Sequence, residues 1–217
     1  MTYADEPDAF PFFGSPVLHG IAETACRGHT VYLTATADDL LKQRVQEGSL
    51  KCLTLNKRPH GHPIPVPSVF IAPRFILLVW LLKWIEAHDN HPRMIFVPSI
   101  RCANIMHKFL NLFFHCYVCT GKTENRDEVI ETFRSEENGL IVATTVLERG
   151  VTVPRADICV YNADSPVFSE AALIQMAGRA GRSFAHPDGD VLFLCMAKSN
   201  LVKKCRESLL EANACAV

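Results

Sequence analysis

The sequence has little net charge, no long apolar run and no secretion signal. Its 217 residues carry a formal net charge of -1, so binding to a polyanion would depend on local cation clusters and backbone amides. The longest apolar stretch, Phe75 to Leu82, is stopped by Lys83. A transmembrane helix needs about 20 apolar residues, so we expect no transmembrane segment. We interpret this stretch as a buried helix; an interface helix is the alternative.

The cysteines lack the spacing of a disulfide scaffold. There are nine, an odd number, and no signal peptide stands at the start of the chain. These features favour free thiols in a reducing compartment, which predicts a cytoplasmic protein. Cys116 and Cys119 have the spacing of half a zinc site, but residues i and i+3 of a strand point to opposite faces. We therefore interpret them as two core thiols.

Short apolar segments rich in branched residues alternate along the chain with longer segments of helical periodicity. This alternation predicts an α/β fold in which helices cover both faces of a parallel sheet. The segment before residue 30 shows no clear strand pattern. The expected strands are 30–35, 52–55, 93–97, 116–119, 140–144, 158–162 and 191–196, and the expected helices are 38–47, 75–88, 100–112, 124–136, 169–177 and 198–212.

A proline-rich stretch, Lys57 to Pro73, interrupts this alternation. Proline removes backbone donors and favours extended chain, so we interpret the stretch as a linker between two domains. The end of a first domain is then expected at 1–56, the linker at 57–73 and a second domain at 74–217. Arg58 could contact phosphate, but we interpret it as a solvated linker residue.

The triplet Gly121-Lys122-Thr123 matches the end of a phosphate-binding loop. A complete loop needs Gly-x4-Gly-Lys-Ser/Thr, because the first glycine lets the backbone curl around the phosphates. Cys116 stands at that position here, inside an apolar strand. The helix expected after the triplet opens with acidic residues, which would repel a triphosphate. We therefore interpret the triplet as a strand-end loop that does not bind ATP.

Two arginines stand in a glycine-rich turn near the C-terminal end, in "QMAGRAGRS" from Gln175 to Ser183. The glycines allow a tight turn, so Arg179 and Arg182 can reach across a cleft as a pair. Guanidinium groups stabilise the charge on a transferring phosphoryl group and accelerate the hydrolysis of nucleoside triphosphates. The pair is therefore a candidate set of arginine fingers.

Two further sets of candidate residues remain, and one of them stands at the ends of expected strands, where open parallel sheets bind ligands. Carboxylates in the N-terminal segment can hold Mg²⁺ through water and orient an attacking water. Threonines end two of the later strands. In chain order these candidates are Asp5, Glu6, Asp8, Thr34, Ala35, Thr36, Thr144 and Thr145.

Five ordered motifs resemble motifs II to VI of superfamily 2 helicases: DEPD, TAT, IFVPS, ATTVLERGVTVP and QMAGRAGR. The resemblance extends from Asp5 to about Arg182. Within this superfamily, DEPDAFPF, RPHGHPIPVP, TTVLERGVT and AGRAGRS are similar to the ComFA family, the DNA-uptake helicases of competent bacteria. The primosomal helicase family PriA is the alternative relative.

The resemblance implies a role for each matching residue. Many relatives have aspartate where this chain has Thr145 and Thr152, which weakens the expectation of contacts to the nucleotide ribose. The implied roles are ATP hydrolysis for Asp5 (through water-bound Mg²⁺), Glu6, Asp8, Gln175, Arg179 and Arg182; domain coupling for Thr34, Ala35 and Thr36; and contacts to the nucleic-acid backbone for Ser99, Thr120, Gly121, Thr144 and Thr145.

The resemblance also implies a RecA-like fold and an ATP-dependent DNA helicase or translocase that uses ATP and Mg²⁺ on single-stranded DNA. Only "MTYA" precedes Asp5 and no phosphate-binding loop occurs, so we expect the end of one RecA-like domain followed by a complete second one. The chain alone would be inactive without the missing N-terminal RecA-like domain, and it would hold no zinc. The competence DNA-uptake machinery, at the inner face of the cell membrane, would be its partner.

Two alternatives to this function remain open. One is a PriA-like replication-restart helicase. The other is a non-enzymatic nucleic-acid-binding domain that keeps the RecA-like fold without the motor.

Overall fold

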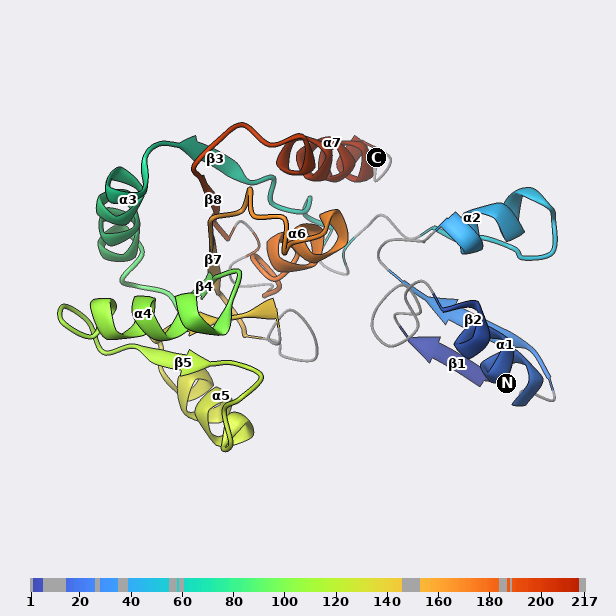
Figure 1. The fold of residues 1–217 in the computed structure, drawn as a ribbon, viewed down its shortest axis with the longest axis horizontal. Helices are drawn as coiled ribbons and strands as arrows, with labels where there is room; N and C mark the ends of the chain where they lie inside the picture. The colour runs from blue at the N-terminus through green and yellow to red at the C-terminus, as the bar shows by residue number, and fades with distance from the viewer. Residues whose placement is uncertain are drawn as a thin grey trace. The chain divides into compact units, whose positions relative to one another are not determined.

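The computed structural model describes residues 2–5, 15–25, 28–34, 39–54, 58, 61–145, 153–183, 187 and 189–214. The chain divides into two compact units, Met1–Leu55 and Asn56–Val217. Figure 1 labels the helices and strands of both units.

The first unit contains two parallel strands, β1 (Thr2–Asp5) and β2 (Thr30–Leu33). Helix α1 (Pro16–Ala25) lies between them in the chain, and helix α2 (Asp39–Gln46) follows β2. The strand and helix expected at 30–35 and 38–47 are therefore present in shortened form. Helix α1 was not predicted.

The strand expected at 52–55 is wrong for the residues that can be described. Residues 51–54 have no regular structure and are exposed. Leu53 is 93% exposed, so no neighbouring element covers the apolar side chains that suggested a strand. A strand without a partner leaves its backbone donors and acceptors unpaired, and short apolar runs alone do not decide its formation.

The second unit is built on a sheet of six parallel strands in the order β3-β8-β7-β4-β6-β5 (Figure 1). Parallel strands must be joined by crossover connections, which here are mostly helices. The strands are β3 (Ser68–Ile71), β4 (Arg93–Phe96), β5 (Tyr117–Cys119), β6 (Leu140–Ala143), β7 (Asp157–Tyr161) and β8 (Val191–Cys195).

Helices cover both faces of this sheet. Figure 1 shows α3 and α4 on one side of β7 and β8, and α6 and α7 on the other. The predicted α/β class, a RecA-like parallel sheet between two helical layers, is therefore confirmed. The helices are α3 (Arg74–Ala87), α4 (Ile100–Leu110), α5 (Arg126–Ser135), α6 (Glu170–Ala177) and α7 (Asn200–Ala214).

Side chains of the central strands alternate between two separate hydrophobic clusters. Met94 of β4 packs in the cluster that contains residues of α5, α6 and α7, whereas Ile95 packs in the cluster that contains residues of α3 and α4. Both side chains are fully buried. Because the strands are buried on both faces, their sequences are continuous apolar runs. Cys119 and Cys116 likewise belong to different clusters, one on each face.

The described residues of the proline-rich stretch, 58 and 61–73, belong to the second unit. Residues 68–71 form the edge strand β3, paired with β8. Before it, the Ile64 backbone N–H donates to the Asn213 side-chain oxygen at 2.8 Å, and the Asn213 amide nitrogen donates to the Ile64 carbonyl at 2.9 Å. Proline is compatible with extended chain that leads into an edge strand, because few ladder donors are needed there.

Helix α3 is apolar around its whole circumference but is covered on one side only. Leu77 and Leu81 are fully buried, whereas Phe75 is 69% and Val79 is 50% exposed. Helix α3 is therefore buried on one side and exposes apolar side chains on the other, so it has features of both interpretations. Among the described helices, none combines the length and apolar character needed to cross a membrane.

Candidate nucleotide and nucleic-acid sites

The two candidate arginine fingers lie in a tight turn that ends helix α6. Ser169 caps the start of the helix by accepting a hydrogen bond from the Ala172 N–H at 3.1 Å. At the other end, the Arg179 N–H donates to the Met176 carbonyl at 3.0 Å, and the Ala180 N–H donates to the Ala177 carbonyl at 3.2 Å. These short-range bonds tighten the chain immediately after the helix. We name residues 178–182 the arginine turn.

Close backbone packing fixes where the arginine turn lies. Gly181 has a φ of 63°, and a Cβ atom on it would lie 2.1 Å from the Pro187 carbonyl oxygen. A Cβ atom on Gly189 would lie 2.5 Å from the Gly181 nitrogen and 3.1 Å from the Ala156 carbonyl oxygen. Ala156 directly precedes β7 and Gly189 lies just before β8. The arginine turn therefore lies beside the amino-terminal ends of these two strands.

Gln175 lies one helical turn before Arg179, and its side-chain amide is buried. Its side chain is 9% exposed, and neither the oxygen nor the nitrogen of its amide has a hydrogen-bond partner among the described residues. Leaving a buried polar group unpaired costs about 1–3 kcal/mol. An external ligand is one partner that could satisfy such a group.

The two arginines differ in exposure. Arg179 is 5% exposed, whereas Arg182 is exposed and its Nε donates to the Gly178 carbonyl at 3.0 Å. Partial desolvation lowers the pKa of Arg182, and no described carboxylate forms an ion pair with it. The Nη groups of Arg182 thus lack a hydrogen-bonding partner within the described residues. A guanidinium in this condition can bind an anionic ligand.

The residues expected to contact nucleic acid lie at the carboxyl-terminal edge of the same sheet. Ser99 follows β4, Thr120 follows β5 and Thr144 follows β6, and these three strands are neighbours. Ser99 caps helix α4 by accepting from the Cys102 N–H at 3.2 Å. Thr145 comes next in the chain and is partly exposed. The arginine turn and this edge therefore lie at opposite ends of the strands.

The Gly121-Lys122-Thr123 triplet forms a turn that differs from a phosphate-binding loop. The Thr120 N–H donates to the Thr123 hydroxyl at 2.9 Å, and the Lys122 N–H donates to the Thr120 hydroxyl at 3.3 Å. These bonds occupy the threonine hydroxyls, and Thr120 is itself buried. Helix α5 begins only at Arg126, so the triplet does not stand at a helix N-terminus.

An open groove of about 410 Å³ lies beside this turn. It carries three cationic side chains, Arg101 and Lys108 from α4 and Lys122 from the turn, and all three are exposed. Ile100, Asn104 and Ile105 of α4 complete its lining. The near-neutral net charge of the chain therefore conceals a local cationic patch next to Ser99 and Gly121.

In the first unit, the described candidates meet at the ends of two paired strands. Asp5 is the last residue of β1 and pairs with Leu33, the last residue of β2. Thr34 directly follows Leu33 in the chain. The backbones of the carboxylate motif and the threonine motif are thus adjacent. Four other candidates lie outside the described residues: Glu6, Asp8, Ala35 and Thr36. The described part of the chain contains no group of acidic, histidine or cysteine side chains that could hold a metal ion.

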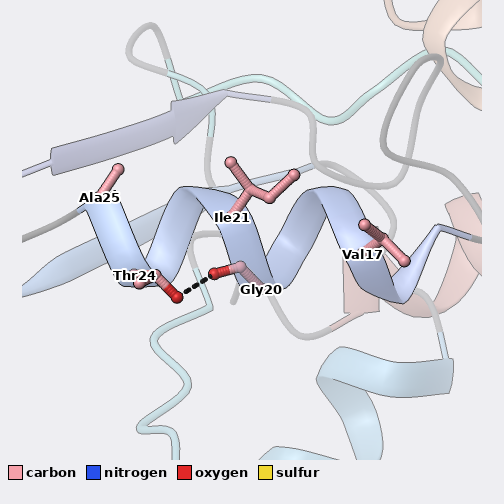
Figure 2. A pocket seen from close by; sticks show the side chains of 5 residues that line it. All are labelled: Val17, Gly20, Ile21, Thr24 and Ala25. Carbon is pink, nitrogen blue, oxygen red and sulfur yellow. Dashed lines mark hydrogen bonds between the residues drawn. The ribbon is translucent and has the colours of Figure 1, made fainter.

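Helix α1 of the first unit has an exposed apolar face. Figure 2 shows the shallow pocket along it, lined by Val17, Gly20, Ile21, Thr24 and Ala25. Val17 is 69% and Ile21 is 59% exposed, and the Thr24 hydroxyl donates to the Gly20 carbonyl at 2.7 Å. Sequence inspection missed this helix, although Val17, Ile21 and Thr24 follow the spacing of one helical face.

Gly181→Ala should destabilise the second unit, because the variant needs a positive φ and collides with the Pro187 carbonyl. The left-handed conformation alone costs about 1–2 kcal/mol. Gly178→Ala is the matched control: its φ is -64° and its nearest contact, the Ile174 carbonyl, is 3.2 Å away. Urea unfolding followed by tryptophan fluorescence measures both. Equal loss of stability in the two variants would contradict the packing described for the turn.

Comparisons with known proteins agree with this architecture. The family described as helicase conserved C-terminal domain matches residues 75–184. Competence protein ComFA of Bacillus subtilis (strain 168) is 33% identical over 96% of this chain and 48% of that protein. Competence protein ComFA of Streptococcus pneumoniae is 33% identical over 94% of this chain and 50% of that protein.

The chain spans about half the length of the curated relatives it matches. A solved structure of S. cerevisiae Dbp5 bound to RNA and ADP BeF3 has the same fold, with a TM-score of 0.68 and 18% identity over 97% of this chain and 56% of that one. Together with the six-stranded parallel sheet and its two helical layers, the matched region identifies the chain as a member of the helicase conserved C-terminal domain family of superfamily 2.

Proposed function

We propose that this chain is part of an ATP-dependent DNA translocase, in which its second unit supplies the arginines that act on ATP. The observation that carries the proposal is the arginine turn. There a buried glutamine amide without a partner precedes an exposed guanidinium without a carboxylate. Both features suit an anionic ligand that another domain helps to hold. The helicase family of this chain implies ATP as that ligand, together with Mg²⁺.

In this proposal the residues divide the work of phosphoryl transfer. Arg182 and Arg179 stabilise the charge that develops on the γ-phosphate, and the Gln175 amide contacts the nucleotide. Asp5 would hold Mg²⁺ through water, and Glu6 and Asp8 belong to the same acidic motif. A nucleic-acid-binding module without a motor would need neither the arginine pair nor the glutamine.

We further propose that the first unit is the end of another RecA-like domain. Two parallel strands seldom stand alone, because parallel sheets are normally covered on both faces. Leu33 of β2 is 49% exposed, and α1 presents the apolar face shown in Figure 2. Both surfaces suit burial by further strands and helices of a domain that carries a phosphate-binding loop. Thr34, Ala35 and Thr36 would couple the nucleotide state of that domain to the second unit.

The cationic groove beside α4 is the proposed path of single-stranded DNA. Ser99, the Gly121 backbone and the strand-end residues Thr144 and Thr145 would contact phosphates along it. Lys122 is the exposed cation of the same turn. Because the groove and the arginine turn lie at opposite ends of the strands, DNA and ATP would bind at separate sites. Opening and closing against the first RecA-like domain would then link hydrolysis to movement along DNA.

The similarity to two competence proteins over almost the whole chain supports a specific role. We propose that the intact motor drives single-stranded DNA uptake in natural competence. It would act from the cytoplasmic side of the membrane, together with the uptake machinery.

In a longer form that contains a phosphate-binding loop, Arg182→Ala should lower ATP turnover by about 10³-fold or more while sparing nucleotide binding. Lys122→Ala is the matched control and should keep basal turnover near that of the wild type, because the triplet forms a strand-end turn. The 217-residue chain alone should release no phosphate, since its sequence contains no complete phosphate-binding loop. Steady-state phosphate release measures all three.

Two results would contradict this assignment. One is turnover by the isolated chain that survives Arg179→Ala and Arg182→Ala. The other is a loss of basal turnover in Lys122→Ala as large as that in Arg182→Ala, which would place ATP at the triplet.

The chain should bind single-stranded DNA weakly, and its affinity should fall steeply with salt. Each phosphate contact contributes about -0.7 to the slope of log affinity against log salt. Arg101→Ala and Lys122→Ala should each make the slope shallower, whereas Arg206→Ala, an exposed change on α7, should not. Fluorescence anisotropy with labelled oligonucleotides at several salt concentrations measures the slopes. Tight binding that salt does not weaken would be inconsistent with a phosphate groove.

A further inference from the structure

We infer that Arg58 is a positioning residue that holds the arginine turn in the geometry needed for ATP hydrolysis. The inference rests on the proposed function for its catalytic part. Arg58 belongs to the proline-rich stretch, where sequence inspection suggested a solvated linker residue.

The guanidinium of Arg58 donates hydrogen bonds to three backbone carbonyls of the arginine turn. Its Nη1 donates to the carbonyls of Ala180 and Gly181, both at 2.9 Å, and its Nη2 donates to the carbonyl of Gly178 at 3.1 Å. The turn therefore accepts hydrogen bonds from a planar guanidinium whose residue lies 120 positions before Gly178 in the chain.

Electrostatics explains why a cation is favourable at these carbonyls. The turn follows the C-terminal end of α6, where backbone carbonyls lack helical partners and carry partial negative charge. The half-buried cation of Arg58 satisfies these carbonyls and interacts favourably with the helix dipole. The bonds to charged donors are stronger than those to neutral ones, so the turn gains rigidity that its own short-range bonds do not provide.

The same hydrogen bonds bring the guanidiniums of Arg58 and Arg182 close together. The Gly178 carbonyl accepts from both Arg58 Nη2 and Arg182 Nε. Burial and the charge of Arg182 lower the pKa of Arg58 to about 10, so Arg58 remains protonated at neutral pH. Because both guanidiniums are charged and bind one carbonyl, the electrostatic potential at the arginine turn favours binding of an anion. Arg58, whose donors are already engaged by the backbone, acts through Arg182 and does not itself contact the phosphate.

The chain supplies a matched control for a merely structural role. Asn213 of α7 also binds the proline-rich stretch, through its two hydrogen bonds to Ile64, and neither of these bonds involves the arginine turn. Arg58→Ala and Asn213→Ala thus both loosen this stretch. Only the first releases the turn.

The test compares Arg58→Ala, Arg58→Lys and Asn213→Ala by two readouts. Hydrogen exchange of residues 176–183 in this chain should rise about 10-fold in both Arg58 variants and stay unchanged in Asn213→Ala. In the longer form that hydrolyses ATP, kcat should fall by about 10- to 100-fold in Arg58→Ala with the KM for ATP almost unchanged. Arg58→Lys keeps the charge without the fork, so it should lose turn protection while its melting temperature stays near that of the wild type.

The outcomes separate this inference from the proposed function. A longer form that shows no ATP turnover as wild type would overturn the proposed function, whatever the exchange data show. Normal wild-type turnover with an unchanged kcat in Arg58→Ala would overturn this inference alone. So would a rise in KM without a fall in kcat, or equal effects of Arg58→Ala and Asn213→Ala on exchange and kcat.

Discussion

The parallel pairing of the six strands is the constraint on which the rest of the second unit depends. Parallel strands all point the same way, so each connection must return across a face of the sheet before the next strand can begin. This places every strand-end residue at one edge and every helix C-terminus of the crossovers toward the other. The separation between the cationic groove and the arginine turn follows from this single geometric rule.

Within that frame, close backbone contacts place the arginine turn, and the Arg58 side chain bonds to its carbonyls. Gly181 and Gly189 let two chain segments approach to distances that no Cβ atom would permit. The ends of β7 and β8 provide the rigid surface against which the turn packs. Such a site orients its arginines through the scaffold, which is how a long, flexible side chain can be aimed with little entropic cost.

Much of this fold could be predicted from sequence, because its central strands are buried on both faces. Ile95 and its neighbours therefore form short apolar runs, which are typical of strands buried on both faces. Strand β3 escaped notice because prolines precede it, and prolines are tolerated only where a strand lies at an edge. Helix α1 was missed although Val17, Ile21 and Thr24 have helical spacing, because the segment contains Pro16 and Gly20, which are typical of turns.

The candidate site was predictable to a lesser degree. The order of the motifs identified the arginines and the strand-end residues, and parallel topology then placed the latter at one edge. The role of Arg58 had no local signal, since its partners lie more than a hundred residues away and are backbone atoms. The roles of the individual site residues stay predictions, and those beyond Asp5 in the acidic motif lie outside the described residues.

The central claim is that the arginine turn completes an ATP site. A structure of the longer form with a non-hydrolysable ATP analogue and single-stranded DNA tests it most directly. We expect the γ-phosphate within hydrogen-bonding distance of Arg179 or Arg182, a partner on the Gln175 amide, and DNA phosphates beside Lys122. A γ-phosphate held by Gly121, Lys122 and Thr123, with the arginine turn facing solvent, would contradict the account.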